Sequence, residues 1–513
     1  MRAAAQKSNR GRGGEAGTGM GPDGRLLHAP LTTAGWIVLL ILAVAAIQAA
    51  IPYPLDDDTA YHFSVARLIR EHGVLYSFPW TRFSWQFDHY ADKEFLFHLL
   101  FVPFTGLGYE TASRIVGTIG GSTVLAVFFL ILRAEKVRFA PFWSLLPLGT
   151  TIFLYRFCQV RPHLFSIALA ILLVWAYCRR RLRLLFFAAL LYPLFYVAFW
   201  QIPLILVVSA EGGRLLSGER CGWQPPVALV LGISAGVALH PNALNLLQIN
   251  WIHMTDILFR NAWGKHVEFN MGEEFEPFSP ADWLKNMTAP TLAMLFAVGG
   301  AWRSRRDESL LPASVLATLF FLLLTLRTNR FLEYFVPFAT LSLALAAEKR
   351  GKGWLLPAFA AVSLCWTVLT GIPLLQYITS SQPRIWQMDK EVGRTIRENV
   401  PAGGAVFTCG WEYTGTLMVD VPDRNYLVAL DPTLLYKRDP ALYDLWYRTL
   451  KDAPPSSAEI VRRSFASRYV VCLDHPTLHP FFDALAADNG TRVLYSDGKW
   501  VLFDLEADGE GRR

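Results

Sequence analysis

The sequence is poor in charge for a chain of its length. Only 18% of its 513 residues are Asp, Glu, Lys or Arg, whereas 53% are hydrophobic and 14% are aromatic. This composition excludes an ordinary soluble enzyme and indicates a polytopic membrane protein. The net charge of +6 does not indicate a nucleic-acid partner, because the basic residues form short clusters between apolar runs rather than one patch.

Cysteine is also scarce, and its spacing carries no motif. The six cysteines include no CxxC pair and no Cys/His pattern of zinc spacing. Where a cysteine lies in or beside an apolar run, its thiol acts as a small hydrophobe. Four cysteines lie there, namely Cys158, Cys178, Cys221 and Cys365. Cys409 and Cys472 lie near the C-terminus and can form a disulfide if that segment faces an oxidising compartment.

Apolar runs that approach the roughly 20 residues needed to cross a bilayer recur along the first 375 residues. We predict about eleven spans. They lie near residues 32–50, 111–132, 139–155, 164–178, 184–199, 202–216, 225–239, 283–302, 310–326, 332–347 and 354–373. Residues 1–31 are basic and rich in Gly and Ala, and we expect a disordered cytoplasmic tail there. No small-residue cleavage site follows the first span, which is predicted to be an uncleaved signal anchor.

Basic clusters set the predicted orientation in the plasma (inner) membrane. They fall in alternate connections between spans, so all of them are cytoplasmic if the N-terminus is inside, as the positive-inside rule requires. The clusters are Arg133, Lys136 and Arg138; Arg179, Arg180, Arg181 and Arg183; Arg214 and Arg220; Arg303, Arg305 and Arg306; and Lys349, Arg350 and Lys352. An odd number of spans then places the C-terminus on the extracytoplasmic side.

Charged and polar residues become frequent from about residue 376. Five short β-like runs alternate there with helix-like stretches such as ALYDLWYRTLKD and SAEIVRRSFA. The runs are GGAVFTCGW, NYLVAL, SRYVVCLD, TRVLYSD and KWVLFDL. We therefore predict an α-helical transmembrane domain over 32–375 and a soluble α/β domain over 376–513 on the outer face. The outer loops 52–110 and 241–282 are too long for plain connectors, and long ordered loops often carry function.

Three aspartates, Asp56 to Asp58, follow the first span directly. Asp58 and Thr59 are good N-cap residues for a short amphipathic helix that stops at Gly73 and lies in the outer interface. One aspartate is enough for a cap. Three carboxylates at a membrane surface lose hydration and repel one another unless a metal or a cationic group is near, which favours a functional site.

A second charged group, Asp92 to Glu94, precedes an apolar segment over 95–104 that is too short to span a bilayer. Lys93 in this position suits an anionic ligand. Snorkelling of its side chain to the interface explains it equally well.

The chain resembles the GT-C glycosyltransferase superfamily in the order of its elements, which are a first span, DDDTAYHFSVAR, DKEFLFHLL, many spans and an outer domain. Members of this superfamily take sugars from polyprenyl-phosphate donors. In its branch of aminoarabinose transferases and their O-mannosyltransferase relatives, an acidic pair is followed by Thr, Tyr and later Ala-Arg. The matching residues here are Asp57, Asp58, Thr59, Tyr61, Ala66 and Arg67. The Lys-Pro-Pro-Leu element of the branch matches Lys93 to Leu96 without its prolines, which leaves Glu94 as an additional carboxylate.

Other elements match the superfamily more loosely. QVRPHLFS resembles an Arg-Pro-His element, HPNAL resembles an Asn-Pro-Tyr-Gly element, and RTNRFLEYFVPF resembles an Arg-rich outer turn. CGWEYTG resembles the Trp-Trp-Asp-Tyr-Gly element of oligosaccharyltransferases, with Glu412 in place of the aspartate. A strand followed by a turn is the stronger interpretation of that stretch.

The resemblance implies an inverting membrane glycosyltransferase that moves a sugar from a polyprenyl-phosphate donor to a lipid, glycan or protein acceptor at the outer face. Such a reaction needs a carboxylate for the acceptor proton and cations for the departing phosphate. We expect Asp57 to act as general base or to orient the acceptor, with Asp58 beside it. The expected substrate-binding residues are Lys93, Glu94, Arg161, His163, His240, Arg327 and Arg330. For the arginines and histidines, snorkelling, structural ion pairs or structural hydrogen bonds remain open as alternatives.

A divalent cation is also left open by the residues. Asp57, Asp58 and Glu94 would suit Mg²⁺ or Mn²⁺. His62, His89, His163 or His240 would allow zinc, although no histidine pair shows ligand spacing in the sequence.

A transporter or a flippase of lipid-linked sugars is the competing function class. Such proteins place ionisable residues within spans and contain repeat-related segments. In this sequence the charges concentrate in the outer loops and no internal repeat is evident, which favours the enzyme.

Overall fold

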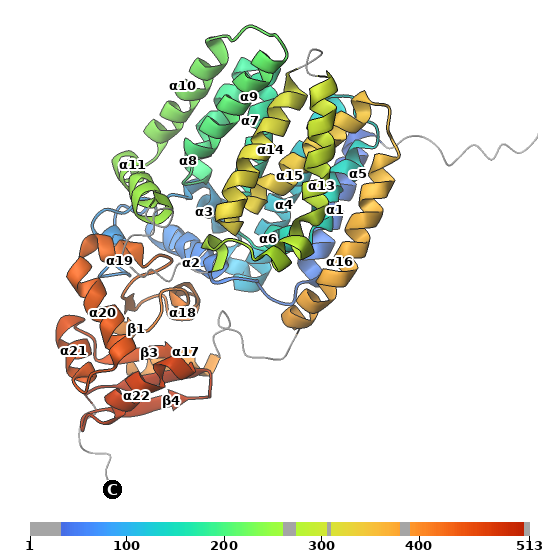
Figure 1. The fold of residues 1–513 in the computed structure, drawn as a ribbon. Coiled ribbons are helices and arrows are strands. Elements are labelled where there is room, and N and C mark those ends of the chain that lie inside the picture. Colours follow the sequence, from blue (N-terminus) through green and yellow to red (C-terminus); the bar gives the residue numbers. More distant parts are fainter. Residues whose placement is uncertain (1–31, 260–272, 305–308, 380–389, 507–513) are drawn as a thin grey trace, which may run out of the picture.

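A bundle of apolar helices carries a small α/β domain at one end (Figure 1). The computed structural model describes residues 32–259, 273–304, 309–379 and 390–506. The predicted tail over residues 1–31 lies outside the described residues, as do Arg305 and Arg306 of one basic cluster and residues 260–272 of the second long loop.

The bundle is built from long helices. They are α1 (Thr33–Ala50), α4 (Tyr109–Ala134), α7 (His163–Cys178), α8 (Leu182–Phe195), α9 (Gln201–Leu216), α10 (Gln224–Leu239), α13 (Pro280–Ser304), α14 (Leu310–Arg327), α15 (Leu332–Lys349) and α16 (Leu355–Thr379). Among the described residues, five helices are long and apolar enough to cross a membrane, and up to seven if each of two bent helix pairs is one span. The prediction of eleven spans exceeds this number, although all but one of the predicted spans fall on a single helix.

The exception is the predicted span over residues 139–155, which is broken. It consists of α5 (Ala140–Leu145), a 3₁₀ turn η3 (Leu146–Gly149) and the start of α6 (Thr151–Cys158). Pro147 lacks the N–H that a continuous helix needs. The chain then bends by 114° between α6 and α7. This bend brings Arg156 and Arg161 to the end of the bundle that meets the α/β domain.

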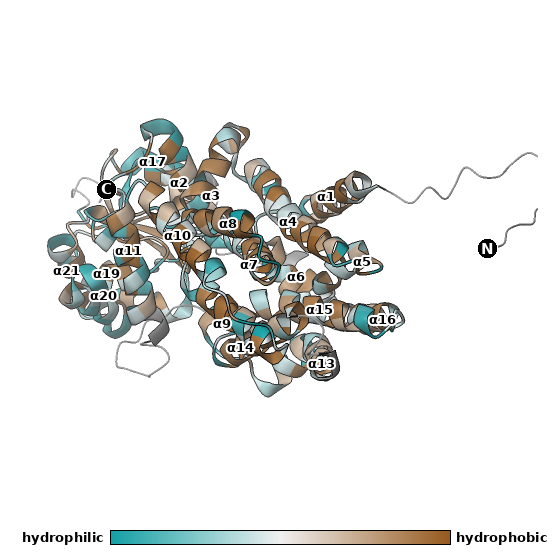
Figure 2. Cartoon of the chain, turned by 90° about the horizontal axis from the view of Figure 1, so that it is seen from above, coloured by the Kyte–Doolittle hydropathy of each residue, from teal (hydrophilic) through white to brown (hydrophobic). Residues whose placement is uncertain are grey.

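The outer surface of the bundle is apolar. Figure 2 shows hydrophobic residues along α1, and α1 and α16 lie at the rim of the bundle. Exposed side chains on α16 include Leu364, Leu369 and Leu375. A surface of this kind is unfavourable in water and is accommodated by lipid. Helix α16 continues to Thr379, so the apolar helix runs slightly past the boundary predicted at residue 375.

The first long loop forms a layer between the bundle and the α/β domain. It contains α2 (Asp57–His72), the 3₁₀ helix η1 (Trp85–Phe87), α3 (Phe95–Phe101) and the 3₁₀ helix η2 (Val102–Leu107). The predicted apolar face of α2 is confirmed, because Tyr61, Val65 and Leu68 belong to one buried cluster. The helix does not lie at an open interface, however. The α/β domain covers this first face, and His62, Phe63 and Ala66 on the other side are buried as well, because they pack against α3 and the helical bundle.

Helix α18 (Thr414–Asp420) makes the contact between the α/β domain and α2. Gly415 permits the close approach, because a Cβ there would lie 2.7 Å from the backbone nitrogen of Tyr61. The guanidinium of Arg67 donates to the carbonyl oxygens of Met418 and Val419, at the C-terminal end of α18. Carbonyl groups in the last turn of a helix lack partners within the helix, so Arg67 satisfies two of them and fixes α18 on α2.

The α/β domain has a five-stranded mixed sheet in the order β2-β1-β3-β5-β4. The strands are β1 (Ala405–Thr408), β2 (Asn425–Tyr426), β3 (Tyr469–Leu473), β4 (Arg492–Ser496) and β5 (Trp500–Asp504). Its further helices are α17 (Lys390–Asn399), α19 (Thr433–Arg438), α20 (Pro440–Asp452), α21 (Ser457–Ser464) and α22 (His479–Ala486). Each predicted β-like run contains one strand, so the predicted α/β character is confirmed. β1 is parallel to β2 and β3, whereas β5 is antiparallel to β3 and β4.

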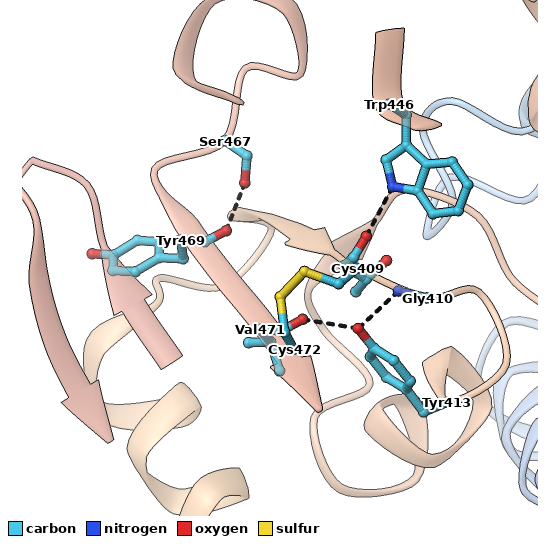
Figure 3. Close-up of a disulfide and its surroundings, with 9 residues drawn as sticks. Cys409, Gly410, Tyr413, Trp446, Ser467, Tyr469, Val471 and Cys472 are labelled. Atoms are coloured by element: carbon cyan, nitrogen blue, oxygen red, sulfur yellow. Dashed lines mark hydrogen bonds between the residues drawn. A yellow bond between two sulfur atoms is a disulfide. The ribbon is translucent and has the colours of Figure 1, made fainter. Parts of the chain in front are cut away.

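Cys409 and Cys472 form a disulfide between the residue after β1 and a residue of β3 (Figure 3). The hydroxyl of Tyr413 accepts from the Gly410 N–H and donates to the carbonyl oxygen of Val471 beside the bridge. The disulfide therefore fixes the turn that leads from β1 to α18. Of the free cysteines, Cys158 and Cys178 are buried, while Cys221 and Cys365 are exposed rather than buried hydrophobes.

Candidate active site

A cavity of about 590 Å³ lies where the bundle, the first loop and the α/β domain meet. Its walls come from distant parts of the chain. They include Asp56 to Asp58 and His62 from α2, Lys93 and Glu94 from the first loop, Arg156 and Arg161 near the bend, Glu274 and Arg330 from later turns, and Trp411, Glu412 and Asp431 from the α/β domain. Charged groups of both signs therefore meet in one partly apolar cavity.

The start of α2 differs from the prediction in one respect. The N-cap residue is Asp56, whose Oδ1 accepts from the Thr59 N–H at 2.9 Å, and not Asp58 or Thr59. The cap therefore uses the aspartate that the family pattern leaves out. Asp57 and Asp58 fall in the first helical turn, where the positive end of the helix dipole favours negative charge.

Arg161 neutralises two of the three aspartates. Its Nε pairs with Asp56, and its Nη1 lies 2.8 Å from Oδ2 of Asp58. The side chain of Arg161 is 13% exposed. Asp56 and Asp58 are thus held by a structural cation, as the repulsion between adjacent carboxylates requires.

Asp57 is in a different position from its neighbours. Its Oδ1 is buried and has no hydrogen-bond partner among the described residues. Burial, together with the negative charges of Asp56, Asp58 and Glu412, raises the pKa of Asp57 well above its usual value, and Arg161 opposes this only in part. A half-buried carboxylate with a raised pKa and an oxygen without a partner at a cavity wall has the properties of a general base.

Three arginines converge on the carboxylate of Glu274. Nη1 of Arg156 lies 2.7 Å from it, Nη1 of Arg330 lies 2.9 Å from it, and Nη1 of Arg161 lies 3.3 Å from it. Burial alone would raise the pKa of Glu274, but the three guanidinium groups lower it below the usual range. This corner of the cavity is a strong anion site, and in this structure a carboxylate of the chain occupies it.

Lys93 also lines the cavity, where its Nζ lies 3.2 Å from Oε1 of Glu94. Burial would lower the pKa of Lys93, but the adjacent carboxylates of Glu94 and Asp431 raise it, so the ammonium is retained. Lys93 is only partly exposed, which does not agree with a side chain that snorkels into water.

The remaining predicted residues separate into two groups. His163 lines the cavity, where its Nε2 donates to the Arg156 carbonyl oxygen, and its Nδ1 is buried without a hydrogen-bond partner in the described part of the chain. His240 and Arg327 are not among the lining residues. Nε2 of His240 donates to the Asp92 carbonyl oxygen and its Nδ1 accepts from Asn242, which is a structural arrangement. Arg327 is exposed at the end of α14.

Several residues that line the cavity are not predicted from the sequence. Arg156 lies inside an apolar helix, and a charge at that depth is itself a signal for function. Glu274 lies in the second long loop, where nothing in the local sequence marks it. Trp411 and Glu412 belong to CGWEYTG, which follows strand β1 and forms the turn that leads into α18, and this turn forms part of the cavity wall.

Binding of a divalent cation depends on whether the oxygen and nitrogen atoms in the cavity wall are free to bind it. Oxygen atoms of Asp56 and Asp58 already contact Arg161, and Glu94 contacts Lys93, so the expected Asp57, Asp58 and Glu94 set offers Mg²⁺ or Mn²⁺ few free ligands. A group with nitrogen donors is present close by. His62, Glu94 and His98 can each offer one atom, and these atoms all lie within 4.8 Å of one another. His98 was not among the expected residues, because its distance in sequence from His62 fits no motif.

No protein-family model matches the chain, and no curated protein matches it in sequence. Solved structures do match its fold. The archaeal oligosaccharyltransferase AglB from Archaeoglobus fulgidus, in complex with an inhibitory peptide and a dolichol-phosphate, has a TM-score of 0.61 at 13% identity over 89% of this chain and 72% of its own. ArnT from Cupriavidus metallidurans, bound to undecaprenyl phosphate, has a TM-score of 0.60 at 12% identity over 94% of this chain and 100% of its own.

A third match is the Archaeoglobus fulgidus oligosaccharyltransferase complex with Zn and sulfate, with a TM-score of 0.57 at 14% identity over 89% of this chain and 70% of its own. The likeness extends over nearly the whole chain, so the helical bundle and the appended domain are both included. The fold is the one implied by the resemblance to GT-C glycosyltransferases, and that prediction is confirmed.

Proposed function

We propose that the protein is an inverting membrane glycosyltransferase that uses a polyprenyl-phosphate sugar as donor. The observation that carries the proposal is Asp57, a half-buried carboxylate whose buried Oδ1 has no partner among the described residues, in a cavity that also holds a cluster of three arginines. A hydroxyl of the acceptor would lose its proton to Asp57 as it attacks the anomeric carbon from the side opposite the phosphate. The sugar–phosphate bond then breaks and the phosphate keeps the electron pair.

The cations supply the second requirement of this reaction. Arg156, Arg161 and Arg330 already bind one anionic group, the carboxylate of Glu274, and a phosphate can take the same contacts. Lys93 lies in the wall of the same cavity and adds a further positive charge. Fixed cations around the leaving phosphate stabilise the charge that develops in the transition state. The proposed reaction uses no metal at the aspartates, because the guanidinium of Arg161 already neutralises Asp56 and Asp58.

We propose that the protein lies in the plasma (inner) membrane, and the positions of the charges support its orientation there. Ion pairs join the predicted cytoplasmic clusters to one another, as in Arg179 with Glu135 and Arg138 with Glu348. The α/β domain lies at the other end of the helices (Figure 1), and the cavity lies where this domain meets the bundle. For the transmembrane domain proposed over 32–375, the positive-inside rule supports an orientation with the domain over 376–513 and the cavity outside. The disulfide supports this side, because disulfides persist in oxidising compartments.

Undecaprenyl phosphates that carry radiolabelled hexoses or pentoses test the proposal. They are added to proteoliposomes that contain the full chain together with a lipid, glycan and protein extract of the source cells. We expect label to enter one acceptor fraction, and we expect Asp57→Ala to reduce that transfer by at least about 100-fold, the usual size of a general-base effect.

Asp444→Asn is the matched control, because Asp444 is an exposed aspartate of α20 that pairs with Arg448. It should transfer at the normal rate. Label that crosses the bilayer without joining an acceptor would instead favour a flippase. Unchanged transfer by Asp57→Ala would refute the assignment of Asp57.

A further inference from the structure

A second group of buried polar side chains lies next to the aspartates, where α2 faces α3. Nδ1 of His62 and Nε2 of His98 are 2.8 Å apart, and a carboxylate oxygen of Glu94 lies within 4.8 Å of both. All three residues are buried, and His62 and Glu94 also line the cavity. We propose that His62, Glu94 and His98 bind a Zn²⁺ ion, at a site separate from Asp57 and Asp58.

Asp92 prepares His98 for this role. Nδ1 of His98 donates to Oδ1 of Asp92 at 2.6 Å, which leaves the lone pair of Nε2 directed at His62. A carboxylate that receives the second ring N–H of a ligating histidine is a common arrangement around zinc, because it fixes the ring and makes the ligand nitrogen more basic. The other oxygen of Asp92 is buried and has no partner within the described residues.

The distances require little movement for a metal to bind. Zinc–ligand bonds of about 2.0–2.1 Å in a tetrahedron hold the ligand atoms about 3.3 Å apart. The two ring nitrogens are 2.8 Å apart, so the rings must separate by about half an ångström and His62 must keep the proton on Nε2 instead of Nδ1. Glu94 already lies within reach, and only its Oε1 contacts Lys93.

The charge balance and the donor atoms favour zinc over other divalent cations. Asp92 and Glu94 bring two negative charges into a buried region, and Lys93 compensates only one of them. Two imidazole nitrogens and one carboxylate oxygen form a ligand set that suits Zn²⁺, whereas Mg²⁺ prefers oxygen ligands alone. Three protein ligands leave the fourth position to water or to a group in the cavity.

The proposed ion would join the two helices of the first loop. His62 comes from α2, whereas His98 comes from α3 and Glu94 is its N-cap residue. Zinc would therefore hold α3 and Lys93 in place against the helix that carries Asp57. This inference does not depend on the proposed reaction, since a zinc content can be measured without any substrate.

The test is a direct measurement of zinc in the full-length protein, purified in detergent without a metal-affinity tag and dialysed against a weak chelator. Mass spectrometry of the metals should give about one zinc ion per chain. His98→Ala and Glu94→Gln should each lose most of it, and Asp92→Asn should bind zinc roughly 10- to 100-fold more weakly in a chelator competition. His89→Ala should keep the full content, because His89 is an exposed histidine of the same loop that stacks on Trp85.

Folding is checked independently by gel filtration and thermal unfolding of each variant. If His98→Ala does not fold, Glu94→Gln and Asp92→Asn remain, since both nearly preserve side-chain volume. Co²⁺ substitution should add the absorption bands of a tetrahedral site to the wild-type protein and not to Glu94→Gln. A wild-type protein that binds no zinc, or variants of the three ligands that bind as much as the wild type, would overturn the proposal.

Discussion

Nη1 of Arg161 lies 2.8 Å from Oδ2 of Asp58, although the two residues are far apart in the sequence. The bend between α6 and α7 makes this pairing, because it turns Arg161 toward the start of α2. The same guanidinium also pairs with Asp56 and leaves Asp57 as the aspartate with a free oxygen. One arginine thus separates the structural carboxylates from the proposed catalytic one.

Loss of this arginine should destabilise the protein. In Arg161→Gln, Asp56 and Asp58 remain buried or half-buried without their cation, which should reduce the free energy of unfolding by about 3 kcal/mol. The double variant with Asp58→Asn should recover part of the loss, because it removes one of the unpaired charges. Denaturant titration in detergent measures both, and equal stability of the wild type and Arg161→Gln would contradict the role of this pair.

The Asp57→Asn variant should be more stable than the wild type at neutral pH. The pKa of Asp57 is raised in the folded state, so the folded state loses stability as the pH rises above the unfolded pKa of about 3.9. Asparagine carries no such cost. The melting temperature of Asp57→Asn should exceed that of the wild type at pH 7, and the difference should vanish near pH 4. A lower melting temperature at pH 7 would show that the carboxylate stabilises the fold.

The pH dependence of sugar transfer should reveal the same group. Transfer needs deprotonated Asp57, so kcat/KM should fall as the pH decreases through its raised pKa, at a higher pH than an ordinary aspartate would give. Glu412→Gln removes one of the negative charges that raise this pKa, while Asp56, Asp58 and Arg161 are unchanged. The acid limb of the profile should therefore move to lower pH in Glu412→Gln. An unmoved limb would mean that another group controls it.

Removal of the disulfide should weaken the α/β domain. The bridge closes a loop of 63 residues, which corresponds to about 4 kcal/mol in the chain-entropy model. Unfolding of a Cys409→Ser, Cys472→Ser double variant should occur at lower denaturant concentration. Cys221→Ser is the control, because Cys221 is exposed and free. Full alkylation of Cys409 and Cys472 in the native protein without a reductant would rule out the bridge.

The contact between α18 and α2 should be sensitive to a single methyl group. A Cβ at Gly415 would lie 2.7 Å from the Tyr61 nitrogen, which is backbone and cannot move aside easily. Gly415→Ala should displace α18 and the adjacent Trp411 and Glu412, with a stability loss of about 1–3 kcal/mol and a fall in sugar transfer. Gly299→Ala is the control, since a Cβ there meets nothing within 4 Å. Normal transfer by Gly415→Ala would show that this contact does not shape the site.

Helices and strands were largely predictable from the sequence because each depends on a local pattern. Apolar runs located the helices of the bundle, and alternating runs such as SRYVVCLD located the strands. The prediction of a single span over residues 139–155 is wrong, because hydropathy does not detect the helix break at Pro147. The helix that begins at Asp57 is also predictable, but its N-cap residue is not. Several good capping residues are adjacent in the sequence, and only the tertiary structure shows which of them accepts the hydrogen bond.

By itself, the sequence determined that this is an apolar, helical membrane chain with an α/β domain and an acidic first loop, because composition and periodicity are properties of neighbouring residues. Only the tertiary structure decided which charges meet. It placed Arg156, Arg161 and Arg330 around Glu274, removed Arg327 and His240 from the cavity, and paired His62 with His98. Such contacts depend on the bend of a helix and the docking of a domain, and no local pattern encodes the distance between residues that only packing brings together.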